Sequence, residues 1–99
     1  MTNYNSAIPY IAGVYGEEKQ LIQTAEEAAE LAQAALKRHK ALTTDETMVA
    51  TREALAEEIA DVLIMCEQII YLEGFENRVR EIIDSKIQRQ IDRIKGVKV

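Results

Sequence analysis

Glycine and proline are nearly absent from this chain, which contains four glycines and one proline in 99 residues. Neither occurs between Glu17 and Arg38, and the residues that favour helices predominate, namely alanine, glutamate, leucine, lysine, glutamine and arginine. This composition excludes collagen-like and disordered chains and argues against an all-β fold. The sequence therefore predicts an all-α protein.

The length predicts a single domain that spans residues 1–99. A chain of this size buries only about 60–65% of the surface that its unfolded form exposes. Large core side chains are also scarce, because 13 of the apolar residues are alanines. A core shared with a second copy would therefore help the chain to fold.

The first segment, residues 1–16, is predicted to form a short N-terminal helix or arm, with Pro9 in its first turn and Gly16 at its end. From Glu17 to about Arg38, small apolar residues recur at spacings of three and four, which predicts an amphipathic helix. This predicted apolar face consists of Leu21, Ala25, Ala28, Ala32 and Ala35.

Two further long helices are expected. Residues 38–42 are interpreted as a connection, and Thr43 as the N-cap of a helix that runs to about Leu72 and stops at Gly74. A third long helix is predicted from about residue 76 to Gly96. Together these segments predict an antiparallel bundle of three long helices with one short arm.

The net charge of −5 argues against binding to nucleic-acid phosphates and suits a protein that holds cations. Cys66 is the only cysteine, so a reducing compartment is expected. The longest apolar run, residues 62–66, is far shorter than the roughly 20 residues that span a bilayer, and no signal peptide is visible. We expect a soluble, cytoplasmic protein that binds neither membranes nor nucleic acid.

Two carboxylate doublets lie on different predicted helices, Glu27 with Glu30 and Glu58 with Asp61. Residues three apart project from the same side of a helix, so two facing doublets would place four carboxylates around a small volume. Such charges repel one another unless a hard divalent cation lies between them, and Mg²⁺ prefers oxygen ligands. The doublets therefore indicate a site for a metal-bound phosphate ester.

The alternative for each doublet is a solvated acidic face. Glu27 and Glu30 lie roughly opposite the predicted apolar face, which favours that alternative for them. Asp61 differs, because 11 of the 14 residues from 59 to 72 are apolar and point in every direction. We therefore expect Asp61 to be buried, and a buried carboxylate needs a basic, hydrogen-bonding or metal partner.

A basic ridge follows on the third long helix, where Lys86, Arg89 and Arg93 share one face. By itself this spacing is typical of an ordinary charged helix surface. Beside a metal site, it would suit the outer phosphates of a triphosphate.

These residues carry a family resemblance over roughly residues 15–95. The order of an ExxE motif, 27 intervening residues and an ExxD motif resembles the pattern of the MazG-like all-α nucleoside triphosphate pyrophosphohydrolases. The resembling segments are Gly16–Leu21 and Glu26–Leu31 for the first motif, Glu57–Met65 for the second, and Lys86–Gln90 for a lysine-containing third segment.

The resemblance implies a Mg²⁺-dependent hydrolase, with Mn²⁺ as a substitute ion, that cleaves a nucleoside triphosphate to a monophosphate and pyrophosphate. It further implies a homodimer or homotetramer in which oligomerisation completes a four-helix core. The implied metal ligands are Glu27, Glu30, Glu58 and Asp61. The implied catalytic residues are Glu26 and Glu27, with Glu26 orienting or deprotonating the attacking water, and the implied phosphate-binding residues are Lys86, Arg89 and Arg93.

Two alternatives remain open at this point. One is a non-enzymatic helical oligomerisation or interaction module, whose acidic faces are solvated or bind a basic partner. The other is a related all-α pyrophosphatase of the phosphoribosyl-ATP type.

Overall fold

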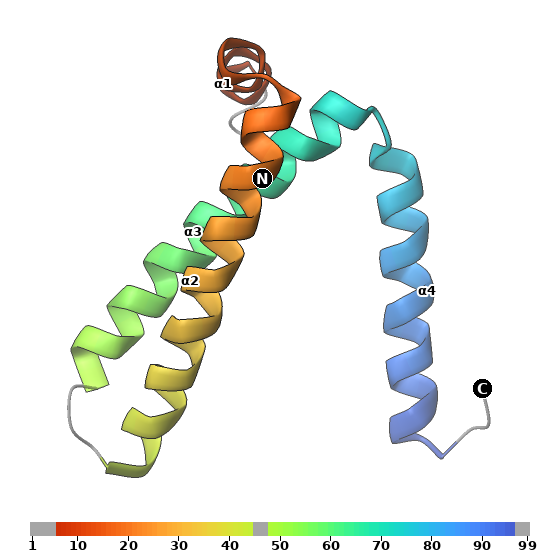
Figure 1. Cartoon of the computed structure of the whole chain (residues 1–99). Helices are drawn as coiled ribbons and strands as arrows, with labels where there is room; N and C mark the ends of the chain where they lie inside the picture. The colour runs from red at the N-terminus through yellow and green to blue at the C-terminus, as the bar shows by residue number, and fades with distance from the viewer. Residues whose placement is uncertain (1–5, 45–47, 97–99) are drawn as a thin grey trace.

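The computed structural model describes residues 6–44 and 48–96, which form four helices and no strand (Figure 1). The all-α prediction is therefore confirmed for these residues. None of the four helices combines the length and the apolar character needed to cross a membrane. The helices are α1 (Ala7–Tyr15), α2 (Glu17–Thr44), α3 (Met48–Glu73) and α4 (Glu76–Ile94).

Two glycines end helices where the sequence predicts it. Gly16 follows α1 with a φ of 85°, and its backbone N–H donates a hydrogen bond of 2.9 Å to the carbonyl of Ala12. Gly74 follows α3 with a φ of 69°. A positive φ is unfavourable for residues with a Cβ atom, so glycine at these positions lets the chain leave one helix and enter the next.

The predicted connection at residues 38–42 is wrong, because α2 continues without a break to Thr44. No residue in this stretch is a helix breaker, and a helix continues until a breaker or a competing contact ends it. Thr43 is likewise not the N-cap of the following helix. Its hydroxyl donates a hydrogen bond of 2.8 Å to the carbonyl of Lys40, within the last turn of α2.

Helices α2 and α3 lie side by side as an antiparallel hairpin (Figure 1). Their least exposed side chains recur at alternating spacings of three and four, the pattern of coiled-coil packing, and we call these two rows the hairpin seam. On α2 the seam residues are Gln20, Thr24, Glu27, Leu31, Ala34, Arg38 and Ala41. On α3 they are Met48, Thr51, Leu55, Glu58, Val62, Met65, Ile69 and Leu72. Gln68 is also buried and lies beside this row, outside its spacing.

The predicted apolar face of α2 is therefore not the face that packs against α3. All five of its residues, from Leu21 to Ala35, are exposed. A neighbouring helix covers only one side of another, and α3 covers the side that carries the seam. A second partner would be needed to cover the alanine-rich side.

Helix α4 diverges from the hairpin after Gly74 and, among the described helices, approaches only α3 (Figure 1). Several of its isoleucines are exposed, including Ile83 at 47% and Ile87 at 51%. The radius of gyration is 16.7 Å, whereas a compact domain of 100 residues has about 13 Å. A single chain thus leaves much of its apolar surface uncovered.

A carboxyl pair lies at the end of the hairpin where α2 begins and α3 ends. A hydrogen bond between the carboxyl groups of Glu17 and Glu73, partial desolvation and the charge of Glu73 raise the pKa of Glu17 above 4.5. The folded protein therefore holds this proton more tightly than the unfolded chain does. The stability contributed by this proton is fully present below pH 4.5 and is lost as the pH rises through the folded-state pKa.

We therefore expect a Glu17→Gln variant to be more stable than the wild type at pH 7 and to lose less stability as the pH rises from 4.5. Urea unfolding at a series of pH values measures both effects. Glu18→Gln is the matched control, because Glu18 is the exposed neighbour in the same helical turn. An unchanged pH dependence in the Glu17 variant would contradict the prediction.

Candidate metal centre

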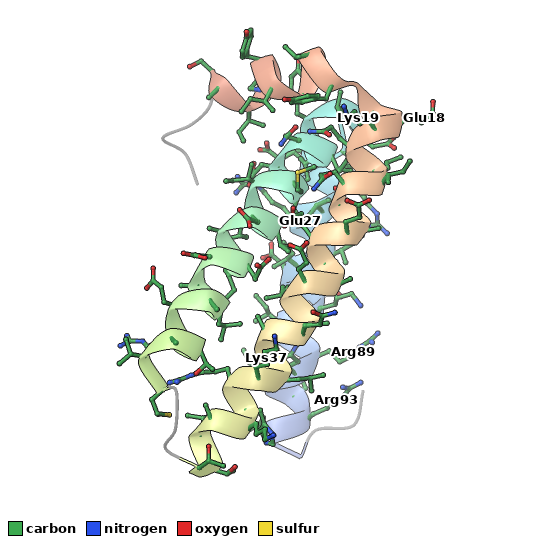
Figure 2. All side chains as sticks on the ribbon, turned by 60° about the vertical axis from the view of Figure 1, so that its left-hand side comes forward. Glu18, Lys19, Glu27, Lys37, Arg89 and Arg93 are labelled. Carbon is green, nitrogen blue, oxygen red and sulfur yellow. The ribbon has the colours of Figure 1, made fainter. Side chains whose placement is uncertain are left out.

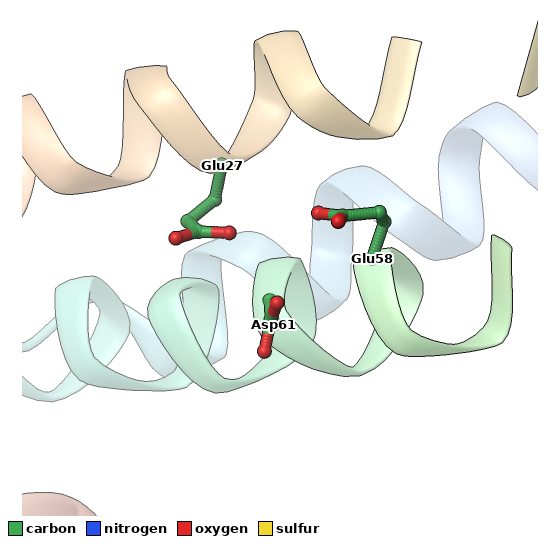
Figure 3. Close-up of side chains that lie close together, drawn as sticks. All are labelled: Glu27, Glu58 and Asp61. Carbon is green, nitrogen blue, oxygen red and sulfur yellow. The ribbon is translucent and has the colours of Figure 1, made fainter. Parts of the chain in front are cut away.

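Three carboxylates from two helices meet in the middle of the hairpin. Glu27 comes from α2, and Glu58 and Asp61 come from α3 (Figure 3). One ligand oxygen of each residue lies within 4.8 Å of the corresponding oxygen of the other two. Glu27 and Glu58 occupy seam positions, where a coiled-coil pattern normally places apolar residues. The packing of α2 against α3 thus brings Glu27 of the first doublet close to both residues of the second doublet.

Two oxygens of this cluster are buried without a hydrogen-bond donor. Glu27 Oε1 accepts a hydrogen bond of 2.8 Å from Gln23 Nε2, on the same helix. Within the described residues, Glu27 Oε2 and Glu58 Oε2 are buried and have no such partner. Buried oxygens of this kind are costly unless a donor or a cation compensates them, and a hard divalent cation prefers such ligands. The donor set therefore fits Mg²⁺ or Mn²⁺.

Glu30 lies beside the same cluster. The negative charge of Glu27 raises the pKa of Glu30 most, followed by the charge of Glu58, by desolvation and by hydrogen bonding to both carboxyl groups. Glu30 is nevertheless exposed, whereas Glu27 and Glu58 are half-buried. The alternative of a solvated acidic face is therefore wrong for Glu27, whose side chain lies in the seam. Glu30 is exposed, as that alternative predicts.

The expectation that Asp61 is buried is wrong, because Asp61 is exposed. The apolar stretch around it is buried on one side only, and Ile59 and Leu63 are 43% and 45% exposed. The physical reason is that α2 covers one side of α3 while α4 turns away. The place of Asp61 in the cluster therefore rests on its distance to Glu27 and Glu58.

The remaining predicted site residues lie outside this cluster. Glu26 is exposed, and it is not among the three residues whose ligand oxygens meet. Lys86, Arg89 and Arg93 are exposed on α4, which does not approach α2 in the described chain. One chain by itself therefore does not bring the basic ridge to the carboxylates.

Two further lysines, absent from the residues predicted above, line a groove that also contains Glu58. A groove of about 610 Å³ runs between α2 and α3, and its lining includes Glu30, Glu58, Lys37 and Lys40. Lys37 follows Glu27 along α2 toward the connected end of the hairpin (Figure 2). The spacing in the sequence could have predicted this position for Lys37. It lies seven residues after Glu30 and therefore on the same side of the helix.

Comparison of the chain with protein-family models, curated proteins and solved structures gave no match.

Proposed function

We propose that this chain is a Mg²⁺-dependent nucleoside triphosphate pyrophosphohydrolase that accepts Mn²⁺ and releases a nucleoside monophosphate and pyrophosphate. The observation that carries the proposal is the meeting of Glu27, Glu58 and Asp61 within 4.8 Å. The two unpaired buried oxygens of Glu27 and Glu58 support it independently of the motif resemblance.

In this proposal Glu27, Glu58 and Asp61 hold the ion, and Glu30 joins them in its deprotonated form. Oxygens that share one Mg²⁺ at 2.0–2.1 Å lie about 3–4 Å apart. Small side-chain rotations from the present 4.8 Å would therefore close the site. When bound, the ion would neutralise phosphate oxygens and lower the pKa of a water. The role of Glu26 toward that water stays a prediction.

We assign the binding of the outer phosphates to Lys37 and Lys40, since both line the groove that contains Glu30 and Glu58. An ammonium group donates charge-assisted hydrogen bonds to phosphate oxygens. The basic ridge of α4 would take part only if a second copy places it over the hairpin.

The Lys37→Met and Lys40→Met double variant is expected to raise the KM for a nucleoside triphosphate by about tenfold or more, because hydrogen bonds to charged groups contribute about 1.5–3 kcal/mol each. The value of kcat should change much less. Steady-state pyrophosphate release measures both constants. Lys19→Met is the control, since Lys19 lies over the ring of Tyr15 at 5.0 Å, at the other end of α2. A normal KM in the double variant would contradict this assignment.

The experiment that tests the function is a pyrophosphate-release assay over a panel of ribo- and deoxyribonucleoside triphosphates, with and without Mg²⁺. Release that depends on the metal is the expected result, and the panel identifies the substrate. Phosphoribosyl-ATP is included to separate the related all-α pyrophosphatase. No release from any substrate would contradict the proposal.

We also propose that a second copy covers the exposed apolar surface and completes a four-helix core, in a homodimer or homotetramer. Three exposed apolar surfaces support this: the alanine-rich side of α2, the side of α3 that carries Ile59 and Leu63, and the isoleucines of α4. Large apolar side chains that a single chain leaves exposed on several helices are typical of surfaces that a partner covers. The large radius of gyration of the single chain supports the same conclusion.

We expect size-exclusion chromatography with light scattering to give at least twice the chain mass of 11.2 kDa. Ile87→Glu should shift the protein toward a monomer and lower its melting temperature, since it would place a charge within the proposed interface. Ser85→Glu is the control, because Ser85 is an exposed polar residue of the same helix. A wild-type mass of a single chain would contradict the proposal.

A further inference from the structure

Two glutamines are the most deeply buried polar residues of the described chain. Gln20 on α2 is 5% exposed and Gln68 on α3 is 2% exposed. Gln20 Nε2 donates a hydrogen bond of 2.7 Å to Gln68 Oε1, and Gln68 Nε2 lies 3.6 Å from the sulfur of Met65. Met65 belongs to the same helix as Gln68, so only the hydrogen bond between the two amides depends on the alignment of the two helices.

The same alignment governs the carboxylate cluster. Glu27 lies seven residues after Gln20 along α2, and Asp61 lies seven residues before Gln68 along α3. Because the helices are antiparallel, one heptad step leads from the glutamine pair to Glu27 and Asp61 on both helices. The glutamine pair and the pair of Glu27 and Asp61 are therefore one heptad apart along both helices of the hairpin.

A second hydrogen bond between the two helices lies at the connected end of the hairpin, where Arg38 Nη1 donates to the carbonyl of Met48 at 2.9 Å. The buried seam residues Ala34 and Ala41 of α2 have small side chains, which allow close approach of α3 without specifying its register. A shift of α3 by one heptad would preserve the seam spacing, but it would separate the two amides in an apolar environment. A buried polar pair that loses its partner is costly, and single polar pairs set the register of coiled coils in this way.

We propose that the hydrogen bond between Gln20 and Gln68 fixes the register of α2 against α3 and thereby positions Glu27 opposite Glu58 and Asp61. Both glutamines are positioning residues in this scheme. The role of the cluster in metal binding rests on the proposed function. The register of the two helices can be measured without metal or nucleotide.

The test replaces both glutamines by methionine, which has a similar length and volume but cannot donate a hydrogen bond. Spin labels at His39→Cys and Ala56→Cys, two exposed positions on α2 and α3, report the alignment by pulsed electron paramagnetic resonance. Cys66→Ser is included in every sample, because Cys66 is a free, exposed thiol. Dilution with unlabelled protein suppresses the signal from pairs of labels that lie on different copies of the chain.

The parent protein should give one narrow distance distribution. The Gln20→Met and Gln68→Met variant should add a second population at a different distance, because a shift by one heptad moves α3 along α2 by about 10 Å at 1.5 Å per residue. Its helicity should be retained, and its Mn²⁺ affinity should fall by about tenfold, as when the supporting residues of a metal site are lost. Gln88→Met and Gln90→Met on α4 form the control pair, since both are exposed.

An unchanged distance distribution in the methionine variant would overturn the proposal. If this variant does not fold, Gln20→Leu with Gln68→Leu replaces it, and failure of both to fold would also overturn the proposal, because the pair would then act through stability and not register. A shifted distribution in a protein without hydrolytic activity would support the register inference and contradict only the proposed function.

Discussion

Replacement of Glu58 by glutamine is expected to reduce metal-dependent pyrophosphate release by more than about 100-fold. Loss of residues that merely support metal ligands already costs about 10–100-fold in activity, and Glu58 is placed as a ligand. Its Oε2 atom is buried without a donor, and an oxygen of Glu58 lies within 4.8 Å of ligand oxygens of Glu27 and Asp61. An amide at this position removes the charge and half of the oxygen ligands while it preserves the shape of the side chain.

Glu57→Gln is the matched control for this experiment. Glu57 precedes Glu58 in α3, is exposed and is not part of the cluster, so its variant should retain activity near that of the wild type. Circular dichroism of both variants verifies that the helices are intact. Full activity of Glu58→Gln would rule out the cluster as the catalytic site. The activity would then have to come from another site of the chain, whereas no release from the wild type would favour the interaction module with solvated acidic faces.

Saturating Mn²⁺ or Mg²⁺ is expected to raise the melting temperature substantially. A ligand at 100 times its Kd stabilises the folded state by about 2.7 kcal/mol. For a domain of about 100 residues this corresponds to a shift of about 10–20 °C, at 4–8 °C per kcal/mol. The physical reason is that the ion compensates the buried oxygens of Glu27 and Glu58 and relieves the repulsion that raises the pKa of Glu30.

The Glu58→Gln variant provides the test of this second prediction. Without metal, it should melt above the wild type, since it removes one negative charge from beside Glu30 and Glu27. With Mn²⁺, its melting temperature should change little. Both proteins are compared at one chain concentration, because association also affects melting. An equal metal-induced shift in the variant and in the wild type would locate the ion elsewhere.

Part of this molecule could be predicted because it depends on neighbouring residues only. The helix ends at Gly16 and Gly74 follow from the positive φ that each glycine adopts. The doublets Glu27 with Glu30 and Glu58 with Asp61 follow from helical geometry, which places residues three apart on one side. The extension of α2 through residues 38–42 could have been expected on the same local grounds, since that stretch contains no helix breaker.

The rest depends on which surfaces meet, and no single segment carries that information. The packed face of α2 is the seam and not the alanine-rich side, because α3 covers only one side of it. Asp61 is exposed because α4 diverges after Gly74. Likewise, Lys37 and Lys40 become groove residues only when α2 and α3 are paired.

The amino-acid sequence by itself determined the helical class, the helix ends at glycines and the two acidic doublets, because backbone preference and helical periodicity act over a few residues. Only the tertiary structure decided which oxygens of Glu27 and Glu58 lose their contact with water and which apolar faces remain uncovered. Burial and desolvation are properties of two surfaces in contact, so they arise only when the helices are packed.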